Sequence, residues 1–380
     1  MTRPGKGLNP ATVTQVRRFT YNANGQTTAI THPENGTVSF LYNPDGTVQR
    51  KTDAKGQRIE WTYTPEGWPA TVRKFRPNGE EDGCGAVTYS YGGQTADPAF
   101  AGTNLQGRVA LVSTGCPYER GGRIEELYSY HVAGAVLRKR LRITRGTSVV
   151  TKDIDYTYDA EGKLVSTKYP DERKPFVTTY DAMARPNGLT QEYSFGEWNN
   201  TELWETRAWV SGVSYGVAGE LLGINIYAGN LGSGASDRRF VETREYNERL
   251  QLTRQRATHG WQGTVAMDLR YVFTSPSSPN NDGRILQREN VVSGETVNYT
   301  YDALQRLEKA ETASAAWGLT WDYDGFGNRW EQRITKGTAP PNTVSFDQTT
   351  NRVNSAWYQH DANGNMTAMP GYNNLTYDID

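Results

Sequence analysis

Alternating apolar and polar residues predict short β-strands along much of the chain. In Arg58–Tyr63 every second residue, beginning with Ile59, is apolar or aromatic, and the residues between are charged or polar. Thr37–Tyr42 alternates in a similar way. Because successive side chains of a strand point to opposite faces, this is the pattern of a strand that packs with one face. The 3.6-residue periodicity of helices is nearly absent, so we expect little or no helix.

Glycines at regular intervals predict tight turns between these strands. The intervals of 10 to 12 residues leave room for strands of about six residues. The turn sequences 43–46 and 53–56 begin with Asn or Asp, whose side chain can bond the backbone two residues on, and end with Gly, which adopts positive φ readily. The pattern is typical of consecutive β-hairpins. The glycines are Gly25, Gly36, Gly46, Gly56, Gly67 and Gly79.

A tyrosine recurs in phase with the turns, which identifies the chain as a repeat array. Tyr21, Tyr42 and Tyr63 lie 21 residues apart, and a glycine follows each of them four residues later. A repeat of this length is one supersecondary unit that buries its apolar face by stacking on its neighbours. Later copies contain Tyr158, Asp159 and Gly162; Tyr180 and Asp181; Tyr246; Tyr301 and Asp302; Tyr323, Asp324 and Gly327; Asp361 and Gly364; and Tyr377 and Asp378.

These copies predict an all-β fold with a single continuous array over residues 1–380. Its antiparallel β-hairpins form a spiralling sheet. The repeat is interrupted near residues 92–123, 186–240 and 273–283, which are rich in Gly and Ser. We expect these insertions to be loops that project from one rim of the sheet.

The repeat resembles the YD repeat of rearrangement-hotspot (RHS) proteins, which bacterial toxin-complex subunits and the teneurin shell share. Tyr158–Lys163 and Tyr301–Leu307 match the repeat unit, Asp322–Arg329 and Asp361–Asn365 resemble its later copies, and the resemblance runs essentially from end to end. It implies a sheet that spirals into a hollow shell, which in bacterial members encloses a C-terminal toxin. The self-cleaving aspartyl protease segment and the variable toxin tail of that family are not visible in this chain.

The resemblance therefore implies a non-catalytic structural shell, not an enzyme. Its partner would be an enclosed toxin polypeptide or neighbouring copies of the chain, and its location would be secreted or at the cell surface. Alternatives are an extracellular binding or adhesion module for carbohydrate or protein, and a head-to-tail filament or tube. The first alternative rests on Trp198, Trp204 and Trp209, which could stack on sugar rings or pack on a partner. Their other interpretation is an aromatic ladder on the sheet.

Charge and hydropathy exclude two classes of partner. The chain of 380 residues carries 41 basic and 42 acidic residues, a net charge of -1, so no overall field attracts nucleic acid. No stretch approaches 18 consecutive apolar residues, so we expect no membrane span, and Met1–Pro10 contains no apolar signal-peptide region. The 23 tyrosines and 10 tryptophans can cover a sheet face where aliphatic residues are scarce.

Residues that could carry chemistry are explained better by the repeat. Asp159, Asp181, Asp302, Asp324 and Asp361 recur in phase with the turns, so we interpret them as turn caps and not as catalysts. Asp361–Asn365 lacks the ligand spacing of an EF-hand calcium loop. No pair among the four histidines has zinc-site spacing. We predict no cofactor and no metal. The histidines are His32, His131, His259 and His360.

Two smaller features leave alternatives open. Cys84 and Cys116 either close one irregular excursion as a disulfide or are two free thiols, which we favour. Arg138, Arg140 and Arg142 alternate with apolar residues and so share one strand face. We interpret this stripe as a solvated strand face; the alternative is a basic surface that binds an acidic partner.

Overall fold

The computed structural model describes residues 15–93, 97, 99–116, 122–198, 201–227, 239–260, 263–276 and 279–379. None of these residues is helical. Twenty-five strands belong to one hydrogen-bonded sheet, and two more form a separate hairpin. The described strand pairs are antiparallel, as in the first hairpins, β1–β2 and β2–β3. The predicted all-β fold of antiparallel hairpins is confirmed.

The strands follow one another closely along the chain. The first eleven are β1 Arg18–Tyr21, β2 Thr27–His32, β3 Gly36–Tyr42, β4 Val48–Thr52, β5 Arg58–Tyr63, β6 Pro69–Phe75, β7 Val87–Tyr91, β8 Val109–Cys116, β9 Gly122–Tyr130, β10 Val136–Arg145 and β11 Ser148–Tyr158. The next are β12 Leu164–Lys168, β13 Phe176–Tyr180, β14 Pro186–Trp198, β15 Thr201–Tyr215, β16 Leu221–Tyr227, β17 Arg239–Tyr246, β18 Leu252–His259 and β19 Thr264–Val272. The last are β20 Gln287–Asn290, β21 Glu295–Tyr301, β22 Leu307–Thr312, β23 Trp317–Tyr323, β24 Arg329–Gly337, β25 Asn342–Thr343, β26 Gln359–His360 and β27 Met366–Ala368.

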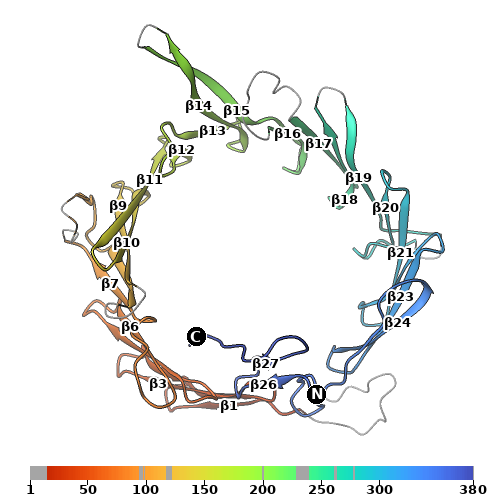
Figure 1. Cartoon of the computed structure of the whole chain (residues 1–380), viewed down its shortest axis with the longest axis horizontal. Helices are drawn as coiled ribbons and strands as arrows, with labels where there is room; N and C mark the ends of the chain where they lie inside the picture. The colour runs from red at the N-terminus through yellow and green to blue at the C-terminus, as the bar shows by residue number, and fades with distance from the viewer. Residues whose placement is uncertain are drawn as a thin grey trace. The chain divides into compact units, whose positions relative to one another are not determined.

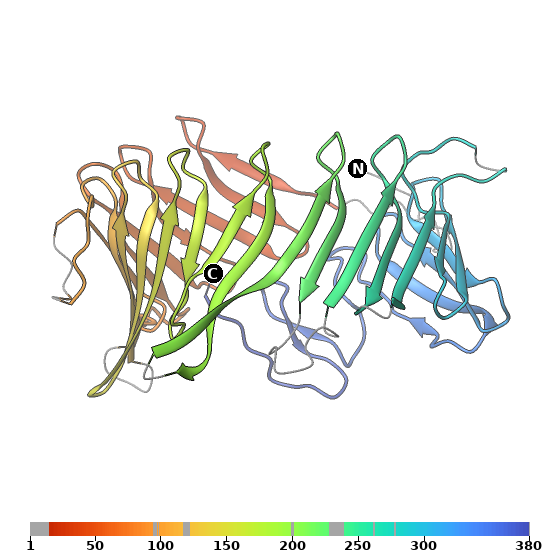
Figure 2. The same cartoon turned by 90° about the horizontal axis from the view of Figure 1, so that it is seen from above.

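The chain divides into two compact units. The first comprises Met1–Asp155, Tyr323–Trp330 and Val344–Asp380, and the second comprises Tyr156–Asp322 and Glu331–Thr343. Within the first unit, β26 and β27 lie next to β1 (Figure 1). Within the second unit, the hairpin of β14 and β15 extends beyond the strands beside it (Figure 2). The prediction of one continuous array over residues 1–380 stays a prediction.

The expectation of a loop over residues 186–240 is wrong. This region holds β14, β15, β16 and the start of β17. Its many polar and aromatic residues suit a hairpin whose two faces are both partly exposed, and the sequence pattern of such a hairpin is easily taken for a loop. The insertion near 92–123 is partly strand, because β8 and the start of β9 lie within it. The described residues of 273–283 contain no strand.

The turns that carry the repeat motif share one hydrogen-bonding scheme, seen first at Asn22–Gln26. The backbone N–H of Gly25 donates to the carbonyl of Asn22 at 3.0 Å, and that of Asn22 donates to the carbonyl of Gln26 at 2.9 Å. Gly25 has φ of 77°. These bonds match a three-residue hairpin loop with a bulge at a left-handed residue, which is why the sequence places Gly there. The Asn22 side-chain oxygen accepts two further backbone N–H groups, from Asn24 and Gln26.

The five recurring aspartates bond the turn in the way that turn capping requires. For example, Asp159 Oδ1 accepts the backbone N–H groups of Glu161 and Lys163, both at 2.9 Å. The same acceptor role is filled by Asp181, Asp302, Asp324 and Asp361. A carboxylate that accepts backbone N–H groups is stabilised in its charged form, and the pKa of Asp159 is accordingly lowered, chiefly by the bond from Lys163.

A second recurring contact joins each repeat to the one before it. Among the described residues, at least eight tyrosine hydroxyls donate to backbone carbonyls at 2.7 to 2.9 Å, and each of these acceptors lies two residues after a turn residue with positive φ. We call this contact the tyrosine latch, and it explains why tyrosine recurs in phase with the turns. The pairs are Tyr42 and Thr27, Tyr63 and Val48, Tyr91 and Pro69, Tyr130 and Val109, Tyr180 and Leu164, Tyr215 and Pro186, Tyr301 and Ile285, and Tyr377 and Met366.

Removing one latch hydroxyl is expected to cost about 1 kcal/mol of the free energy of unfolding, the usual net value of a hydrogen bond. Tyr63→Phe keeps the ring and loses only the 2.8 Å bond to the carbonyl of Val48. Tyr21 is a matched control, because it opens the first described hairpin and is 60% exposed. Urea denaturation should place Tyr63→Phe below the parent chain and Tyr21→Phe level with it. Equal midpoints for the two variants would contradict a stabilising latch.

The sheet has a shallow apolar core, because no helix of the described residues lies on it. The most buried large side chains include Leu127 and Val297, each 1% exposed. Polar rows occupy much of the remaining surface. Thr62 and Thr71, for example, share a hydroxyl hydrogen bond of 2.7 Å across β5 and β6. Cross-strand pairs of this kind stabilise a sheet whose faces stay partly wet.

Candidate functional site

The basic stripe on β10 is paired with carboxylates of its own unit. The Arg140 guanidinium donates to both oxygens of Asp153 at 2.7 Å and to Asp97 at 3.0 Å. Arg138 pairs with Asp155, and Arg142 with Glu125. The acidic partners of the stripe in the structure are thus the chain's own residues, and binding of a separate acidic partner stays a prediction.

Arg140 is the most enclosed of the three arginines. Its side chain is 12% exposed, and its guanidinium lies 5.2 Å from the ring centre of Phe100. The hydrogen bond to Asp153 is the main cause that raises the pKa of Arg140. Burial acts to raise the pKa of Asp97, but the hydrogen bond from Arg140 and the N–H of Ala99 outweigh it and lower the pKa.

The loop that supplies Asp97 is packed on the sheet. Phe100 and Leu105 are 2% and 7% exposed, and the backbone N–H of Thr103 donates to the Ser129 hydroxyl at 3.1 Å. Nearby in sequence, Cys84 is disulfide-bonded, so the alternative of a disulfide is the one that the structure has. The side chain of Cys116 lies outside the described residues.

Two of the three candidate tryptophans are engaged on the sheet. Trp204 lies under Lys174, whose Nζ is 4.7 Å from the ring centre. The Trp209 indole N–H donates to Gln191 at 3.3 Å, and the ring lies 6.0 Å from that of Phe176. Trp209 thus makes an aromatic pair on the sheet, whereas the contacts of Trp204 are with the cationic side chains of Arg173 and Lys174. Binding of a sugar or a protein partner by these residues stays a prediction. The side chain of the third, Trp198, lies outside the described residues.

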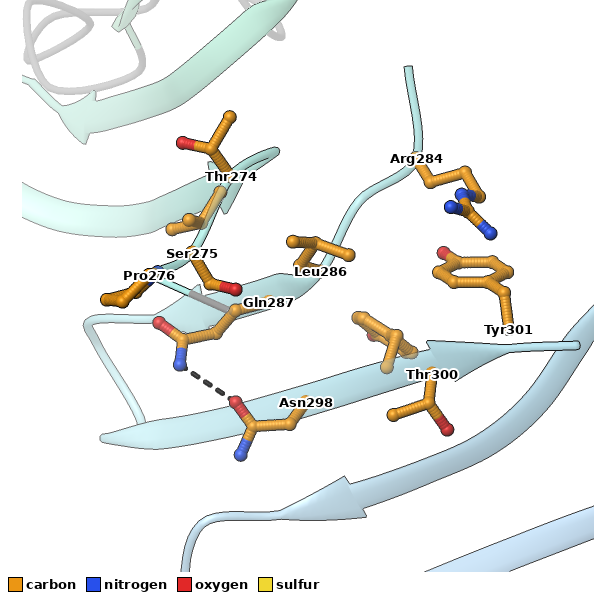
Figure 3. A pocket seen from close by; sticks show the side chains of 11 residues that line it. Thr274, Ser275, Pro276, Arg284, Leu286, Gln287, Asn298, Thr300 and Tyr301 are labelled. Atoms are coloured by element: carbon orange, nitrogen blue, oxygen red, sulfur yellow. Dashed lines mark hydrogen bonds between the residues drawn. The ribbon is translucent and has the colours of Figure 1, made fainter. Parts of the chain in front are cut away.

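A pocket of about 530 Å³ lies in the second unit, beside β20 and β21 (Figure 3). The loop Thr274–Pro276 forms one side of it. Gln287 and Asn298 are joined there by an amide hydrogen bond of 2.8 Å. The pocket volume is in the range that holds small molecules.

The charge of Arg284, which lines this pocket, is paired with a carboxylate of the protein. Arg284 Nε donates to Asp282 at 2.9 Å, and the guanidinium lies 5.1 Å from the ring centre of Tyr301. Burial raises the pKa of Tyr299 and of Tyr301, so both phenols stay protonated at neutral pH. The lining offers hydroxyls, amides and phenol rings, which suit a small neutral polar group.

Three of the histidines have local partners of their own. His32 contacts Phe19, His259 contacts Phe240, and His131 Nδ1 accepts the backbone N–H of Ala133. The described residues contain no group of three His, Cys, Asp or Glu side chains that could hold a metal. They also contain no helix with the length and hydropathy of a membrane span.

The C-terminal part of the first unit contacts its first hairpins through the turn of β26 and β27. Lys55 Nζ lies 3.1 Å from Asp361 Oδ2. The Asn363 side chain accepts the backbone N–H of Lys55 at 3.2 Å and donates to Asp53 at 2.5 Å. The turn of β4 and β5 thus holds the turn of β26 and β27 from one side.

Arg352 holds the same turn from the other side. Its guanidinium donates to three backbone carbonyls, those of Glu34 at 2.9 Å, Asp361 at 2.9 Å and Ala362 at 3.0 Å. Gly364 packs against Glu34 so closely that a Cβ atom at Gly364 would lie 2.4 Å from the Glu34 carbonyl oxygen. We call the contacts that Arg352, Lys55 and Asn363 make the turn clamp. Sequence reasoning missed it, because no local pattern links residues about 300 positions apart.

His360, beside the turn clamp, is expected to make it sensitive to acid. Burial, followed by the charge of Arg352, lowers the pKa of His360, although Asp361 acts in the opposite direction. A lowered histidine pKa means that the unfolded chain binds more protons, so stability falls as the pH drops below about 6.5. Thermal denaturation between pH 7 and 5 should show a smaller loss in His360→Gln than in the parent chain. Identical profiles would exclude His360 as the cause.

The fold is similar to that of toxin-complex structures. One is the Photorhabdus luminescens Tc holotoxin pore with a substitution in TccC3, with a TM-score of 0.72 and 16% identity over 95% of this chain and 18% of that chain. The TcdB2–TccC3 crystal structure has a TM-score of 0.72 and 16% sequence identity, over 95% of this chain and 19% of that chain. The crystal structure of the same complex without its hypervariable C-terminal region has a TM-score of 0.66 and 16% sequence identity, over 89% of this chain and 17% of that chain. The chain spans less than a fifth of each of these chains. No protein-family model and no curated protein matches the sequence.

Proposed function

We propose that the chain is a segment of the wall of an RHS-type toxin container and that the wall isolates a guest polypeptide. The observation that supports this most is the likeness of nearly the whole chain to the TcdB2–TccC3 structures, at a TM-score of 0.72 over 95% of its length. One of those structures is described as lacking a hypervariable C-terminal region, so chains of this fold are joined to variable segments. The sequence repeat supports the same family.

The local chemistry suits a wall. A stable wall needs strand pairs whose register is fixed, and sheet faces that carry little unpaired charge. The turn caps and the tyrosine latches fix each hairpin relative to the previous one. Charges on the sheet are paired across strands, as in Arg254 with Asp268 at 2.7 Å and Arg140 with Asp153 at 2.7 Å. A guest would therefore meet a nearly neutral surface.

We propose further that this segment is non-catalytic and acts outside the cell or on its surface. The aspartates that could have served as acids or bases each accept backbone N–H groups of their own turn. That role requires the ionised form in a fixed position, which suits a structural residue.

Protease protection tests the container proposal. The chain is expressed together with the polypeptide that follows it in the same reading frame, and the purified protein is treated with a protease at native pH and again after denaturation. We expect the following polypeptide to resist cleavage only in the native protein. Cleavage at equal rates in the two states would contradict a container, and a reading frame that stops after residue 380 would contradict a covalently attached guest.

A further inference from the structure

We propose that residues 344–379 form a strap, held on the first hairpins of the sheet by the turn clamp, that opens as a unit while the sheet stays folded. The inference does not depend on the container function. It rests on the internal bonding of this segment, on the kind of contact that holds it and on the shape of the turn that is held.

The strap has its own internal structure. Its strands β26 and β27 pair with each other, as His360 with Met366, and among the described residues they belong to no larger sheet. The Tyr377 hydroxyl latches onto the carbonyl of Met366 at 2.7 Å, and Phe346 forms an isolated bridge with Val353. Because these bonds lie within the strap, they persist when it leaves the sheet.

The clamp is built from side chains, whereas the sheet is built from backbone ladders. β2 and β3 are joined by a ladder of paired residues, whereas the strap meets their turn through the side chains of Arg352 and Asn351, which donate to the carbonyl and the carboxylate of Glu34. Besides the turn clamp, its bonds to the described residues of the unit include those from Gln15 to the carbonyl of Gln348, from Asn328 to Asn351, and one backbone bond from Val344 to Trp330 at its start. Lys55 adds an ion pair to Asp361, and both side chains are partly exposed, at 24% and 13%. Elements that are joined by few contacts open at lower free energy than elements within a backbone ladder.

The held turn has the same pair of backbone hydrogen bonds as the turns that carry the repeat motif, from Asp361 to Asn365 and from Gly364 to Asp361. It meets the sheet through the Asn363 side chain, which donates to Asp53, and through Gly364, whose φ of 85° allows close approach to Glu34. The bonds from Arg352 to the carbonyls of Asp361 and Ala362 lie inside the strap. On the other side, Gly36 packs against Ala54, so the turns of β2–β3 and β4–β5 already form a stacked row. The strap turn therefore extends this row, and the row is a docking surface for one more turn.

Zero-length crosslinking and hydrogen exchange test the strap. A carbodiimide activates the Asp361 carboxyl, and attack by Lys55 Nζ then forms an amide with release of the urea. We expect this crosslink within a single chain, at dilute protein concentration. The pair Lys163 and Glu161, 2.6 Å apart, is the internal control for the reagent.

Lys55→Gln removes only the ion pair that joins the strap to the sheet, Arg352→Gln removes the bond to Glu34 together with two bonds inside the strap, and Lys163→Gln is the matched control on another turn. We expect amide exchange in residues 359–368 to rise at least about tenfold in the two clamp variants, since each loses charge-assisted hydrogen bonds. β18 and β19 should keep the exchange rates of the parent chain, and the Lys163→Gln variant should match the parent chain throughout.

Three results would overturn the proposal. The first is that the Lys163 control crosslinks but Lys55 and Asp361 do not. The second is that exchange in β18 and β19 rises together with that in residues 359–368, which would mean that the strap is part of the cooperative sheet. The third is that the crosslink forms only between two chains, which would assign the contact to exchange of the strap between copies.

Discussion

Replacement of Arg140 by methionine is expected to lower the free energy of unfolding by about 3 kcal/mol, because Asp97 and Asp153 lose the enclosed guanidinium that pairs with both of them. Asp97 is 11% exposed and Asp153 is 30% exposed, so neither is fully solvated once the guanidinium is gone. The loop that holds Asp97 and Phe100 also loses its contact with β10. Urea denaturation gives the global effect, and proteolysis of residues 97–108 gives the local one.

Arg138→Met is the matched control for this effect. Arg138 occupies the same face of the same strand, but its side chain is 48% exposed and its hydrogen-bonded partner is the partly exposed Asp155. Exposed ion pairs contribute about 0 to 1 kcal/mol, so this variant should stay close to the parent chain. Equal losses in the two variants would show that Arg140 does not anchor the loop.

Alanine at Gly364 is expected to have the second large effect, because it combines backbone strain with a collision. Positive φ costs an L-residue about 1 to 2 kcal/mol, and the new Cβ atom would meet the Glu34 carbonyl oxygen at 2.4 Å. Overpacking of this kind costs about 1 to 3 kcal/mol more, unless the turn moves away. We therefore expect a lower thermal midpoint and faster amide exchange in residues 359–368.

Gly327 separates the two causes. It holds the same place in the Asp324 turn, with φ of 96°, and a Cβ atom there would have nothing within 4 Å. Gly327→Ala thus reports the backbone strain alone, and the excess effect of Gly364→Ala reports the contact with Glu34. If the two variants behave alike, the close approach at Glu34 does not stabilise the protein.

The local structure of this protein could be predicted from its sequence because the repeat depends on short-range chemistry. The strand expected at Arg58–Tyr63 has those bounds in the structure, and Asp159 bonds its turn as expected. The tyrosine latch also has a counterpart in the sequence, because each latch tyrosine recurs in phase with an earlier turn. The sequence did not predict the carbonyl that accepts the tyrosine hydroxyl. That partner depends on the register between two neighbouring hairpins, which the sequence of neither hairpin shows by itself.

The turn clamp could not be predicted, for a different physical reason. Asp361–Gly364 shares the pattern of Asp, Ala, a variable residue and Gly with the turns 53–56 and 159–162, and nothing in it marks it as the one that Arg352 and Lys55 hold. Leu250 and Gln305 also show where the pattern fails. They take the positive φ position of the turn, at 59° and 63°, where the repeat has glycine. The Asn or Asp turn cap stabilises such turns in spite of the backbone strain. A search for regularly spaced glycines therefore does not find them.

The measurement that tests the container account most directly is a cryo-electron microscopy structure of the natural full-length protein that includes these residues. The account predicts that the hairpins of residues 15–379 form part of a wall, with density for a guest polypeptide on one side of it. A well-ordered structure in which both faces of this sheet are open to solvent, with the remaining polypeptide outside, would contradict it.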